Sequence, residues 1–246
     1  MRELVPTFTD DVDIHEFYAR GWIDEGGLRM NFVSSLDGAA SIQGQSRGLQ
    51  TPGDNAVFAA MRDLADVVLV GAGTARDEGY RPSKPGAQRR ANRERFGLAP
   101  VPPIALVSRA LTLDPAWNLF TGAEPDARTV VITCAASDPS VRAALAEVAD
   151  VLVLGDESVD LAAILPALGE RGLTRVLGEG GPSIFGEFAA AGLVDELCLS
   201  VSPLLAGPGP QRITHGMPWP DGPRPYSLYG LLEEDGALFG RYHAVR

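Results

Sequence analysis

The sequence contains few of the residues that cross-links, metal sites and Schiff bases require. Its 246 residues include two cysteines, three histidines and a single lysine, Lys84. Cys134 and Cys198 lie in apolar, strand-like stretches, so we expect buried thiols. The histidines are scattered, and their spacing offers no metal site. Lys84 stands in the turn-like sequence Ser-Lys-Pro-Gly, which disfavours pyridoxal chemistry because a Schiff-base lysine needs an apolar pocket.

The chain also lacks a long apolar run and an excess of positive charge. No segment is long enough to span a bilayer, and the first residues are too acidic and too broken for a signal peptide. The net charge of −11 disfavours a nucleic-acid or acidic-membrane partner. We therefore expect a cytoplasmic protein that acts on a small molecule, without a nucleic-acid or membrane partner.

Positive charge is nevertheless concentrated in one segment, residues 81–95. Six basic side chains there stand against one acidic side chain; they are Arg81, Lys84, Arg89, Arg90, Arg93 and Arg95, against Glu94. The simpler interpretation is a solvated, mobile loop, and the alternative is a lid that grips a phosphate group.

Short apolar segments alternate with helical patterns along most of the chain. The pattern predicts strands at 28–33, 66–70, 104–107, 129–133, 151–154, 174–177 and 194–201. It predicts helices after Thr51 and at 138–149, 160–171 and 182–191. Such alternation is typical of an α/β fold with a mostly parallel central sheet and helices on both faces. Residues 226–233 and 237–244 flank Glu-Asp-Gly, which predicts a C-terminal antiparallel hairpin.

We expect one domain over residues 28–246, with residues 1–27 as an extension packed on its surface. Turns rich in glycine or polar residues follow three of its strands, at Ser34–Gly38, Gly71–Thr74 and Gly178–Gly181. Ligands of α/β sheets bind outside the carboxyl ends of the strands, so these turns are candidate binding loops. None matches the dinucleotide fingerprint G-x-G-x-x-G.

The turn at 178–181 is the most informative of the three. Gly180 and Gly181 can bring bare backbone close to a ligand. The helix that begins at Pro182 points free N–H groups at the same place, which suits a phosphate. Glu179 would repel such an anion, and we therefore expect this side chain to face a second ligand.

Three motifs together carry a resemblance to a known family. They are S-S-L-D-G at 34–38, the series from Met61 to Thr74 that ends in G-A-G-T, and G-E-G-G followed by L-V-D-E-L and S-P-L-L-A-G. Over roughly residues 28–207 they resemble the reductase domain of riboflavin biosynthesis, which has a dihydrofolate reductase-like fold. The resemblance implies a homodimeric, NADPH-dependent enzyme of the 5-amino-6-(5-phosphoribosylamino)uracil reductase type. The motifs of the family's deaminase domain are absent.

The resemblance also assigns residues to the two ligands. Cofactor contacts are expected at Ser34, Ser35, Thr74, Glu78, Ser108, Arg109, Gly178, Gly180, Gly181, Pro182, Ser183 and Ile184. Substrate contacts are expected at Asp37, Ser46, Asp54, Phe58, Arg62 and Glu179, with Glu179 and Asp54 as the catalytic candidates. Asp37 has a competing explanation, because aspartate also stabilises Asp-Gly turns through its own backbone.

Two alternatives remain open. Pro52, Asp54 and Phe58 resemble the helix start of dihydrofolate reductases, in which the acid binds the pterin and the aromatic ring packs on it. A dihydrofolate or pterin reductase with Asp54 as the pterin-binding acid is therefore the first alternative. The second is a nucleotide-binding module without turnover, because a fold does not guarantee an activity.

Overall fold

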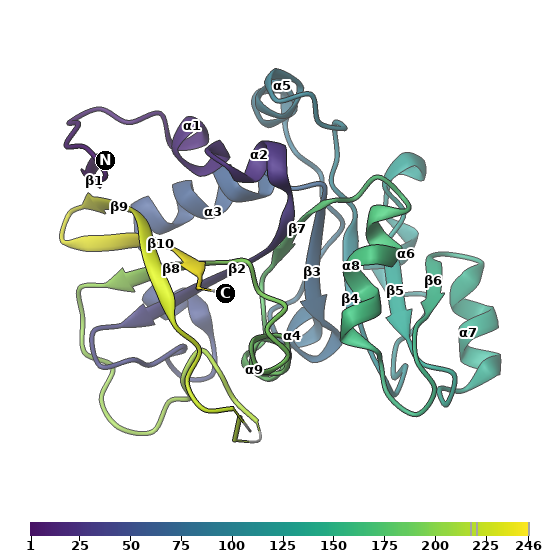
Figure 1. The fold of residues 1–246 in the computed structure, drawn as a ribbon. Coiled ribbons are helices and arrows are strands. Elements are labelled where there is room, and N and C mark those ends of the chain that lie inside the picture. Colours follow the sequence, from purple (N-terminus) through teal and green to yellow (C-terminus); the bar gives the residue numbers. More distant parts are fainter. Residues whose placement is uncertain (217, 220, 246) are drawn as a thin grey trace. The chain divides into compact units, whose positions relative to one another are not determined.

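The computed structural model describes residues 1–216, 218–219 and 221–245, and the chain forms two compact units (Figure 1). Unit 1 combines Met1–Arg62 with Gly178–Arg246, and unit 2 is Asp63–Leu177. Unit 2 is thus one continuous stretch of chain, whereas unit 1 is assembled from the two segments that flank it.

Unit 1 contains strands in the order β1-β9-β10-β8-β2. Their bounds are β1 Arg2–Val5, β2 Gly27–Ser35, β8 Glu196–Ser202, β9 Tyr226–Glu234 and β10 Ala237–Ala244. The pair β2–β8 is parallel, while β1–β9, β9–β10 and β10–β8 are antiparallel. The helical segments are α1 Ile14–Ala19, α2 Trp22–Glu25, η1 Ser46–Leu49, α3 Pro52–Leu64 (which runs on into unit 2) and α9 Pro182–Ala190. Strands β9 and β10 confirm the predicted C-terminal hairpin.

Unit 2 contains strands in the order β7-β3-β4-β5-β6. Their bounds are β3 Val67–Gly71, β4 Ile104–Val107, β5 Val130–Thr133, β6 Asp150–Val153 and β7 Arg175–Gly178. The pairs from β3 to β6 are all parallel. The helical segments are α4 Ala72–Asp77, α5 Ala87–Arg95, α6 Asn118–Thr121, η2 Pro125–Ala127, α7 Pro139–Ala146 and α8 Leu161–Gly169. The predicted mostly parallel α/β architecture is confirmed.

Side-chain caps explain where three of the predicted helices begin. The Thr51 hydroxyl accepts a hydrogen bond from the backbone N–H of Asp54 at 3.1 Å, one turn into α3. The carboxylates of Asp138 and Asp160 accept N–H groups at the starts of α7 and α8 in the same way. Each cap satisfies a donor that the first helical turn leaves unpaired, which is why these residue types predicted the helix starts well.

Strand β8 has a polar buried face. Burial alternates along it, and the buried positions are Glu196, Cys198, Ser200 and Ser202. Buried polar groups need partners, and three of these side chains find theirs on other elements of unit 1, while Cys198 contacts Glu196 on the same strand. The Ser202 hydroxyl, for example, donates to the backbone carbonyl of Leu49.

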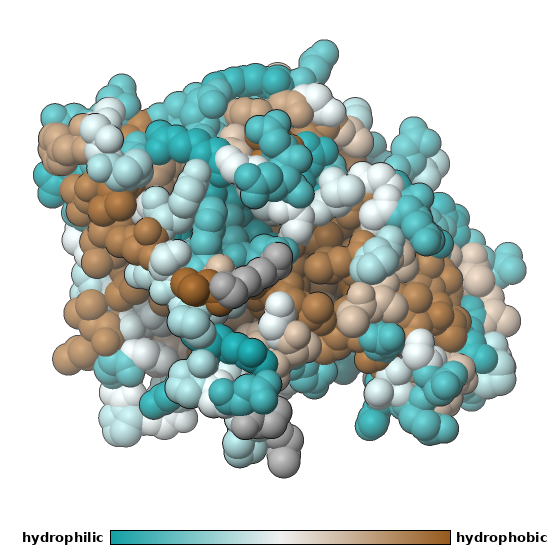
Figure 2. Space-filling view, in the orientation of Figure 1, coloured by the Kyte–Doolittle hydropathy of each residue, from teal (hydrophilic) through white to brown (hydrophobic). Residues whose placement is uncertain are grey.

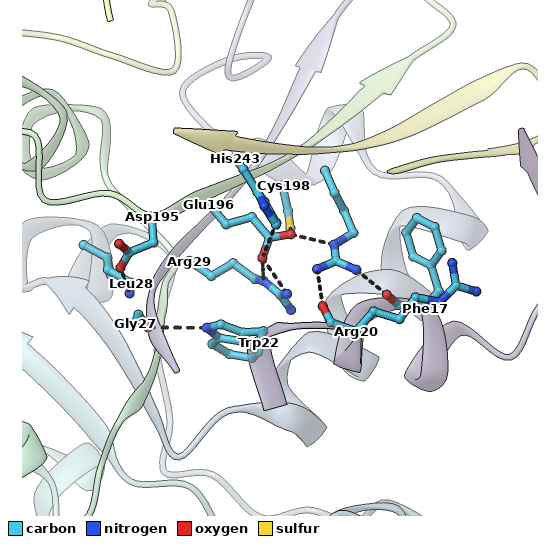
Figure 3. A network of polar contacts seen from close by, with 11 residues as sticks. Phe17, Arg20, Trp22, Gly27, Leu28, Arg29, Asp195, Glu196, Cys198 and His243 are labelled. Carbon is cyan, nitrogen blue, oxygen red and sulfur yellow. Dashed lines mark hydrogen bonds and ion pairs between the residues drawn. The ribbon is translucent and has the colours of Figure 1, made fainter. Parts of the chain in front are cut away.

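Glu196 is the centre of a buried network of two arginines (Figure 3). Arg29 donates to it from two nitrogens, at 2.8 and 2.6 Å, and Arg241 from one at 2.5 Å. Both guanidinium groups are fully buried. Burial alone would raise the pKa of Glu196, but the two positive charges outweigh it and lower the pKa.

The same network holds the first helices of the chain. Arg241 also donates to the carbonyls of Phe17 and Arg20, at the end of α1, and Arg29 lies over the Trp22 ring at 4.0 Å. Residues 1–27 therefore contribute buried side chains to unit 1. The division into a surface extension and a single domain over 28–246 stays a prediction.

The basic segment differs from the loop that we expected. Residues 87–95 form helix α5, and Arg93 is fully buried. Arg93 donates to the carbonyls of Ala65 at 2.8 Å and Ala99 at 2.6 Å. Because Ala65 precedes β3, α5 lies at the amino end of that strand, away from α4 at its other end (Figure 1). The prediction of a mobile loop is wrong for these residues.

Each unit has exposed apolar residues on its surface. Apolar side chains gather over β9 and β10 in unit 1 and over α8 and β6 in unit 2, on the face seen in Figure 2. Leu228, Leu238 and Val153 are among the exposed apolar residues of these strands. Within the described residues, no helix is both long and apolar enough to cross a membrane.

Candidate functional site

Strands β2 and β8 end side by side. Their parallel register pairs Ser34 with Val201 and Ser35 with Ser202. Both predicted serines are buried, and the Ser35 hydroxyl accepts the N–H of Ala39 at 3.0 Å. The side chain of Ser35 is therefore used within its own turn, and Ser35 can offer a ligand mainly backbone groups.

Asp37 is held by the chain itself. Its carboxylate accepts hydrogen bonds from the Ser35 hydroxyl and from the backbone N–H groups of Ala206, at 3.1 Å, and Gly207, at 2.8 Å. The hydroxyl bond and then the two backbone bonds lower the pKa of Asp37 to about 2. These contacts join the turn after β2 to the loop after β8, and they support a structural role for Asp37.

Helix α3 presents three of the predicted residues in a stripe. Asp54, Phe58 and Arg62 are four residues apart, and side chains at that spacing share a helix face. The guanidinium carbon of Arg62 lies 4.5 Å from the centre of the Phe58 ring. The stripe is about 12 Å long at 1.5 Å per residue, which is comparable with a heterocycle carrying a sugar.

Arg62 and Glu179 form a bidentate ion pair. Two guanidinium nitrogens donate to the two carboxylate oxygens, each at 2.6 Å. The Glu179 side chain is only 2% exposed, whereas that of Arg62 is 23% exposed. Fork-to-fork geometry of this kind fixes both side chains. The two predicted substrate contacts therefore form one group whose solvent-facing part is mainly Arg62.

Asp54 is buried, and burial disfavours the charged form of its carboxyl group. Burial raises the pKa of its carboxyl group, and a hydrogen bond from the Ser200 hydroxyl opposes this rise. Ser200 comes from the polar face of β8, and it was not predicted. The alternation Glu-Leu-Cys-Leu-Ser-Val-Ser in residues 196–202 was the available signal, since it places every second, polar residue on one face of the strand.

The glycine loop meets the start of α9 as the sequence suggested. Gly180 has φ +102°, a conformation that side-chain-bearing residues rarely adopt, and the Gly180–Gly181 peptide bond is cis. Gly181 is the N-cap of α9, Pro182 is the first helical residue, and no side chain caps the first turn. Uncapped N–H groups at the start of a nine-residue helix suit a pyrophosphate. Ser183 is exposed and Ile184 half-buried in this first turn.

Gly178 has a different role from its neighbours. A Cβ atom built on Gly178 would lie 2.2 Å from the sulfur of Met30, so glycine is needed there for packing against β2. One on Gly180 would lie 3.3 Å from the ring of Phe32, which stacks on Phe185 of α9. This glycine thus lets the loop pass close to β2.

The other predicted cofactor residues lie in unit 2. Thr74 and Glu78 belong to α4 and its C-cap, so the turn expected after Gly71 is helical from Ala72 onward. Ser108 follows β4; it is buried, and its hydroxyl accepts the N–H of Leu111 at 3.1 Å. Arg109 is exposed. In unit 1, Ser46 begins η1 and is half-buried.

The two cysteines are buried, and the described residues contain no cluster of metal-binding side chains. Cys134 and Cys198 are buried free thiols, as expected, and burial raises the pKa of Cys198 well above its usual range. Among the described residues, no group of three or more His, Cys, Asp or Glu side chains is arranged to hold a metal ion. The polar features of the candidate site are a carboxylate–arginine pair, a buried carboxyl group and a glycine-flanked helix start.

The family model described as the RibD C-terminal domain matches residues 27–220. A 2,5-diamino-6-ribosylamino-4(3H)-pyrimidinone 5′-phosphate reductase of Archaeoglobus fulgidus is 28% identical over 180 residues, 72% of this chain and 80% of its own length. The riboflavin biosynthesis protein RibD of Bacillus amyloliquefaciens is 29% identical over 73% of this chain, which spans only 46% of that protein.

Solved structures agree on the fold. A pyrimidine reductase-like protein from Corynebacterium diphtheriae aligns with a TM-score of 0.83 and 26% identity, covering 96% of this chain and all of its own. A dihydrofolate reductase from Enterococcus faecalis aligns with a TM-score of 0.51 and 14% identity, covering 90% of this chain and 98% of its own, a likeness of fold alone. The predicted dihydrofolate reductase-like fold is confirmed.

Proposed function

Because the chain belongs to the RibD C-terminal domain family, we propose that it is an NADPH-dependent reductase that acts on a phosphoribosylamino-pyrimidine. Family membership and relatives named as pyrimidinone phosphate reductases support an oxidoreductase with a nicotinamide cofactor. The choice of NADPH as the cofactor and of a phosphoribosylamino-pyrimidine as the substrate is our own and goes beyond these two findings.

The observation that carries the proposal is the pairing of Arg62 with Glu179 at the start of the glycine loop. Glu179 immediately precedes the bare backbone of Gly180 and Gly181 and the uncapped start of α9. An anion-binding helix start and an arginine-held carboxylate so close in the chain suit a cofactor pyrophosphate and a polar substrate, respectively. The glycine loop suits the cofactor, since no side chain caps the first turn of the helix α9 that follows it.

We assign four tasks to residues of this chain. The start of α9, from Gly181 to Ser183, binds the pyrophosphate. The Arg62–Glu179 pair orients the substrate, with the arginine as the group that meets its phosphate or ribose. The face of the Phe58 ring packs against the Arg62 guanidinium and holds it in place. Asp54 recognises the heterocycle. Bound NADPH supplies the hydride for the ribose carbon that becomes the ribityl group.

Asp54 further favours one form of the substrate. An ionised carboxylate accepts hydrogen bonds and donates none, so it pairs with adjacent N–H donors. The diaminopyrimidinone offers such a pair, a ring N–H beside an amino group, whereas the uracil places a carbonyl oxygen there. We therefore propose that the diamino form is the better substrate, as in the name of the Archaeoglobus fulgidus relative.

We further propose that the enzyme prefers NADPH to NADH and that it forms a homodimer. Arg109 is an exposed cation directly after Ser108 and is suited to a 2′-phosphate. Exposed Leu228 and Leu238 on β9 and β10 support self-association, because apolar surface on strands is commonly covered by a partner. NADH kinetics with Arg109→Ala, and light scattering with Leu238→Asp, test these two points.

The main test measures loss of NADPH absorbance with three substrates side by side: the diaminopyrimidinone ribosyl phosphate, its uracil analogue and dihydrofolate. The proposal expects turnover of both pyrimidines, with the higher kcat/KM for the diamino form. A preference for the uracil would overturn the assignment of Asp54 alone. Turnover of dihydrofolate only would establish the pterin reductase alternative, and tight NADPH binding without any turnover would establish the non-catalytic module.

A further inference from the structure

A segment of unit 1 joins the turn after β2 to the helix start that we assign to the cofactor, although it contains none of the assigned residues. We call this segment, Pro203–Gly216 after β8, the strap. Its first part is bound to the turn after β2. The Leu204 carbonyl accepts the N–H of Leu36 at 2.9 Å, and further along the strap the Gln211 carbonyl accepts the N–H of Ala40 at 2.8 Å.

The other end of the strap lies against the first turns of α9. The His215 N–H donates to the Pro182 carbonyl at 3.0 Å. The His215 carbonyl passes so close to the helix that a Cβ atom built on Gly186 would lie 2.4 Å from its oxygen. Later in the chain, Arg224 donates to the carbonyl of Ala190, the last residue of α9, at 2.7 Å. The backbone of His215 therefore fixes the start of α9 from outside the helix.

The composition of the strap makes it a stiff connector. Pro203, Pro208 and Pro210 each fix φ, which leaves the chain fewer conformations to lose on folding. Gly207 and Gly209 have φ +81° and +116°, a region that glycine enters without steric cost. Because the strap is short, stiff and bound at both ends, the turn after β2 and the start of α9 cannot shift independently of each other.

We propose that the strap positions the start of α9 for cofactor binding, and that Gly186 and His215 are the positioning residues through which it acts. The inference rests on the proposed function, because it concerns the helix start that we assign to the pyrophosphate. The N–H groups of a helix start bind an anion only when they point at it. A Cβ atom on Gly186 would need about 1 Å more room to reach an ordinary contact with the His215 carbonyl, and a displacement of about 1 Å weakens a positioned contact substantially.

Fluorescence titration of the intact protein measures the Kd of NADPH, and steady-state kinetics measure kcat and the KM of the pyrimidine. Gly186→Ala should raise the Kd of NADPH about tenfold or more, with little change in the KM of the pyrimidine. Gly169→Ala in α8 is the matched control, because a Cβ atom there meets open space, and it should leave the Kd unchanged. A merely structural contact would lower the melting temperature without changing the affinity of the folded molecules.

Two substitutions of His215 separate its backbone from its side chain. His215→Pro removes the N–H that binds the Pro182 carbonyl, and it should raise the Kd of NADPH about threefold to tenfold, the scale of one hydrogen bond. His215→Ala keeps this N–H and should match the wild type. An equal loss of affinity in His215→Ala would transfer the effect to the imidazole and overturn the role of the backbone.

Limited proteolysis tests the coupling in the wild-type protein. The strap carries an exposed arginine, Arg212, after which trypsin can cut. A ligand that favours the docked strap lowers the population of the open form, so NADPH should slow this cut in the wild type and less so in Gly186→Ala. Cleavage after Arg171, in the exposed turn before β7 of unit 2, is the internal reference and should not respond to NADPH.

Failure of this inference can be distinguished from failure of the proposed function. An unchanged Kd of NADPH in both Gly186→Ala and His215→Pro would overturn the positioning role of the strap and leave the proposed function intact. Cleavage after Arg212 that NADPH does not slow would have the same meaning. A wild-type protein that binds no NADPH would overturn the proposed function and the positioning role with it.

Discussion

Arg62 and Glu179 form one rigid group, because both oxygens of the carboxylate accept from the guanidinium at the same distance, 2.6 Å. Arg62 comes from the last turn of α3 and Glu179 from the loop before α9. Their pairing makes the orientation of each side chain depend on the other, so their roles in binding cannot be separated by single substitutions.

Arg62→Ala and Glu179→Ala should therefore reduce kcat/KM by similar factors, about tenfold or more, and the double variant should be hardly worse than either. NADPH affinity should stay close to wild type in all three. Steady-state kinetics and cofactor titration measure this. A collapse of NADPH binding in Glu179→Ala would mean that this side chain serves the cofactor.

The free energy of unfolding provides a second test of the Arg62–Glu179 pair. Arg62→Ala removes the bidentate arginine from a carboxylate that is only 2% exposed, and should cost about 3 kcal/mol of unfolding free energy. The ion pair of Arg128 with the exposed Asp150 is the matched control. Asp150→Ala leaves the bonds from Arg128 to the carbonyls of Ala146 and Ala149 in place, and it should cost less than about 1 kcal/mol. Equal losses in the two variants would contradict the burial of Glu179.

Asp54→Asn should stabilise the protein at neutral pH while it lowers kcat/KM for the diaminopyrimidinone. Burial raises the pKa of Asp54 in the folded state, so ionisation of this group opposes folding as the pH rises from its ordinary pKa of 3.8 through the raised value. An amide has the same shape and no charge, and it escapes this cost. Thermal unfolding at neutral pH and near pH 3 tests the effect, which should be small at the lower pH.

Ser200→Ala is the companion variant. It removes the hydrogen bond that lowers the pKa of Asp54, and the pKa should rise further. The pH profile of kcat/KM should then shift upward in the limb assigned to Asp54. An unchanged profile together with a normal KM would show that Asp54 does not meet the substrate.

Gly180→Ala should lower both stability and NADPH affinity. A Cβ atom at φ +102° costs about 1–3 kcal/mol, and here it would also press on Phe32. Gly192, just after α9, has φ +68° and open space around it, so Gly192→Ala should cost only about 1 kcal/mol and leave cofactor binding intact. Thermal unfolding and NADPH titration of both variants distinguish strain from loss of the binding loop.

Arg93→Ala should destabilise unit 2 by about 3 kcal/mol, because it removes a fully buried arginine that donates to the buried carbonyl of Ala65 and to the carbonyl of Ala99. Arg90 pairs with Glu124 in a half-exposed bridge, and Arg90→Ala should cost less than about 1 kcal/mol. Activity per folded molecule should be unchanged in Arg90→Ala. A large rise in substrate KM there would revive the idea of a phosphate-gripping lid.

Acid should weaken the protein partly through Asp37. The pKa of this group falls from 3.8 to about 2 on folding, so its contribution is complete above pH 4 and disappears between about pH 4 and pH 2. Asp37→Asn should remove that part of the pH dependence of urea unfolding. Asp138→Asn, at the N-cap of α7, should change acid stability in the same direction without affecting activity.

Much of the fold followed from local patterns in the sequence. Apolar runs and side-chain caps such as Thr51 and Asp138 predicted strands and helix starts to within a few residues, since both signals act over a few neighbours. Helix α5 was missed because its residues are almost all polar, and its stability depends on the buried bonds of Arg93. A sequence does not reveal that an arginine is buried.

The site was predicted as a set of residues but not as an arrangement. Motifs singled out Arg62 and Glu179, yet 117 positions separate them and nothing local shows that they bind each other. Asp37 could be interpreted in two ways, and only the contacts with Ala206 and Gly207 favour the structural one. Long-range pairing depends on how strands are ordered in space, which short patterns do not contain.

Strand β8 lies between β2 and β10, so β2 lacks this partner strand until late in synthesis. Arg29 on β2 is synthesised 167 residues before its partner Glu196. At about 5–20 residues per second, the ribosome needs roughly 10 to 30 s to supply that partner. Unit 2 is complete on the nascent chain during this interval, while β2 still has an unpaired edge and an uncompensated arginine. We therefore expect the unpaired edge of β2 to be open to aggregation during this interval.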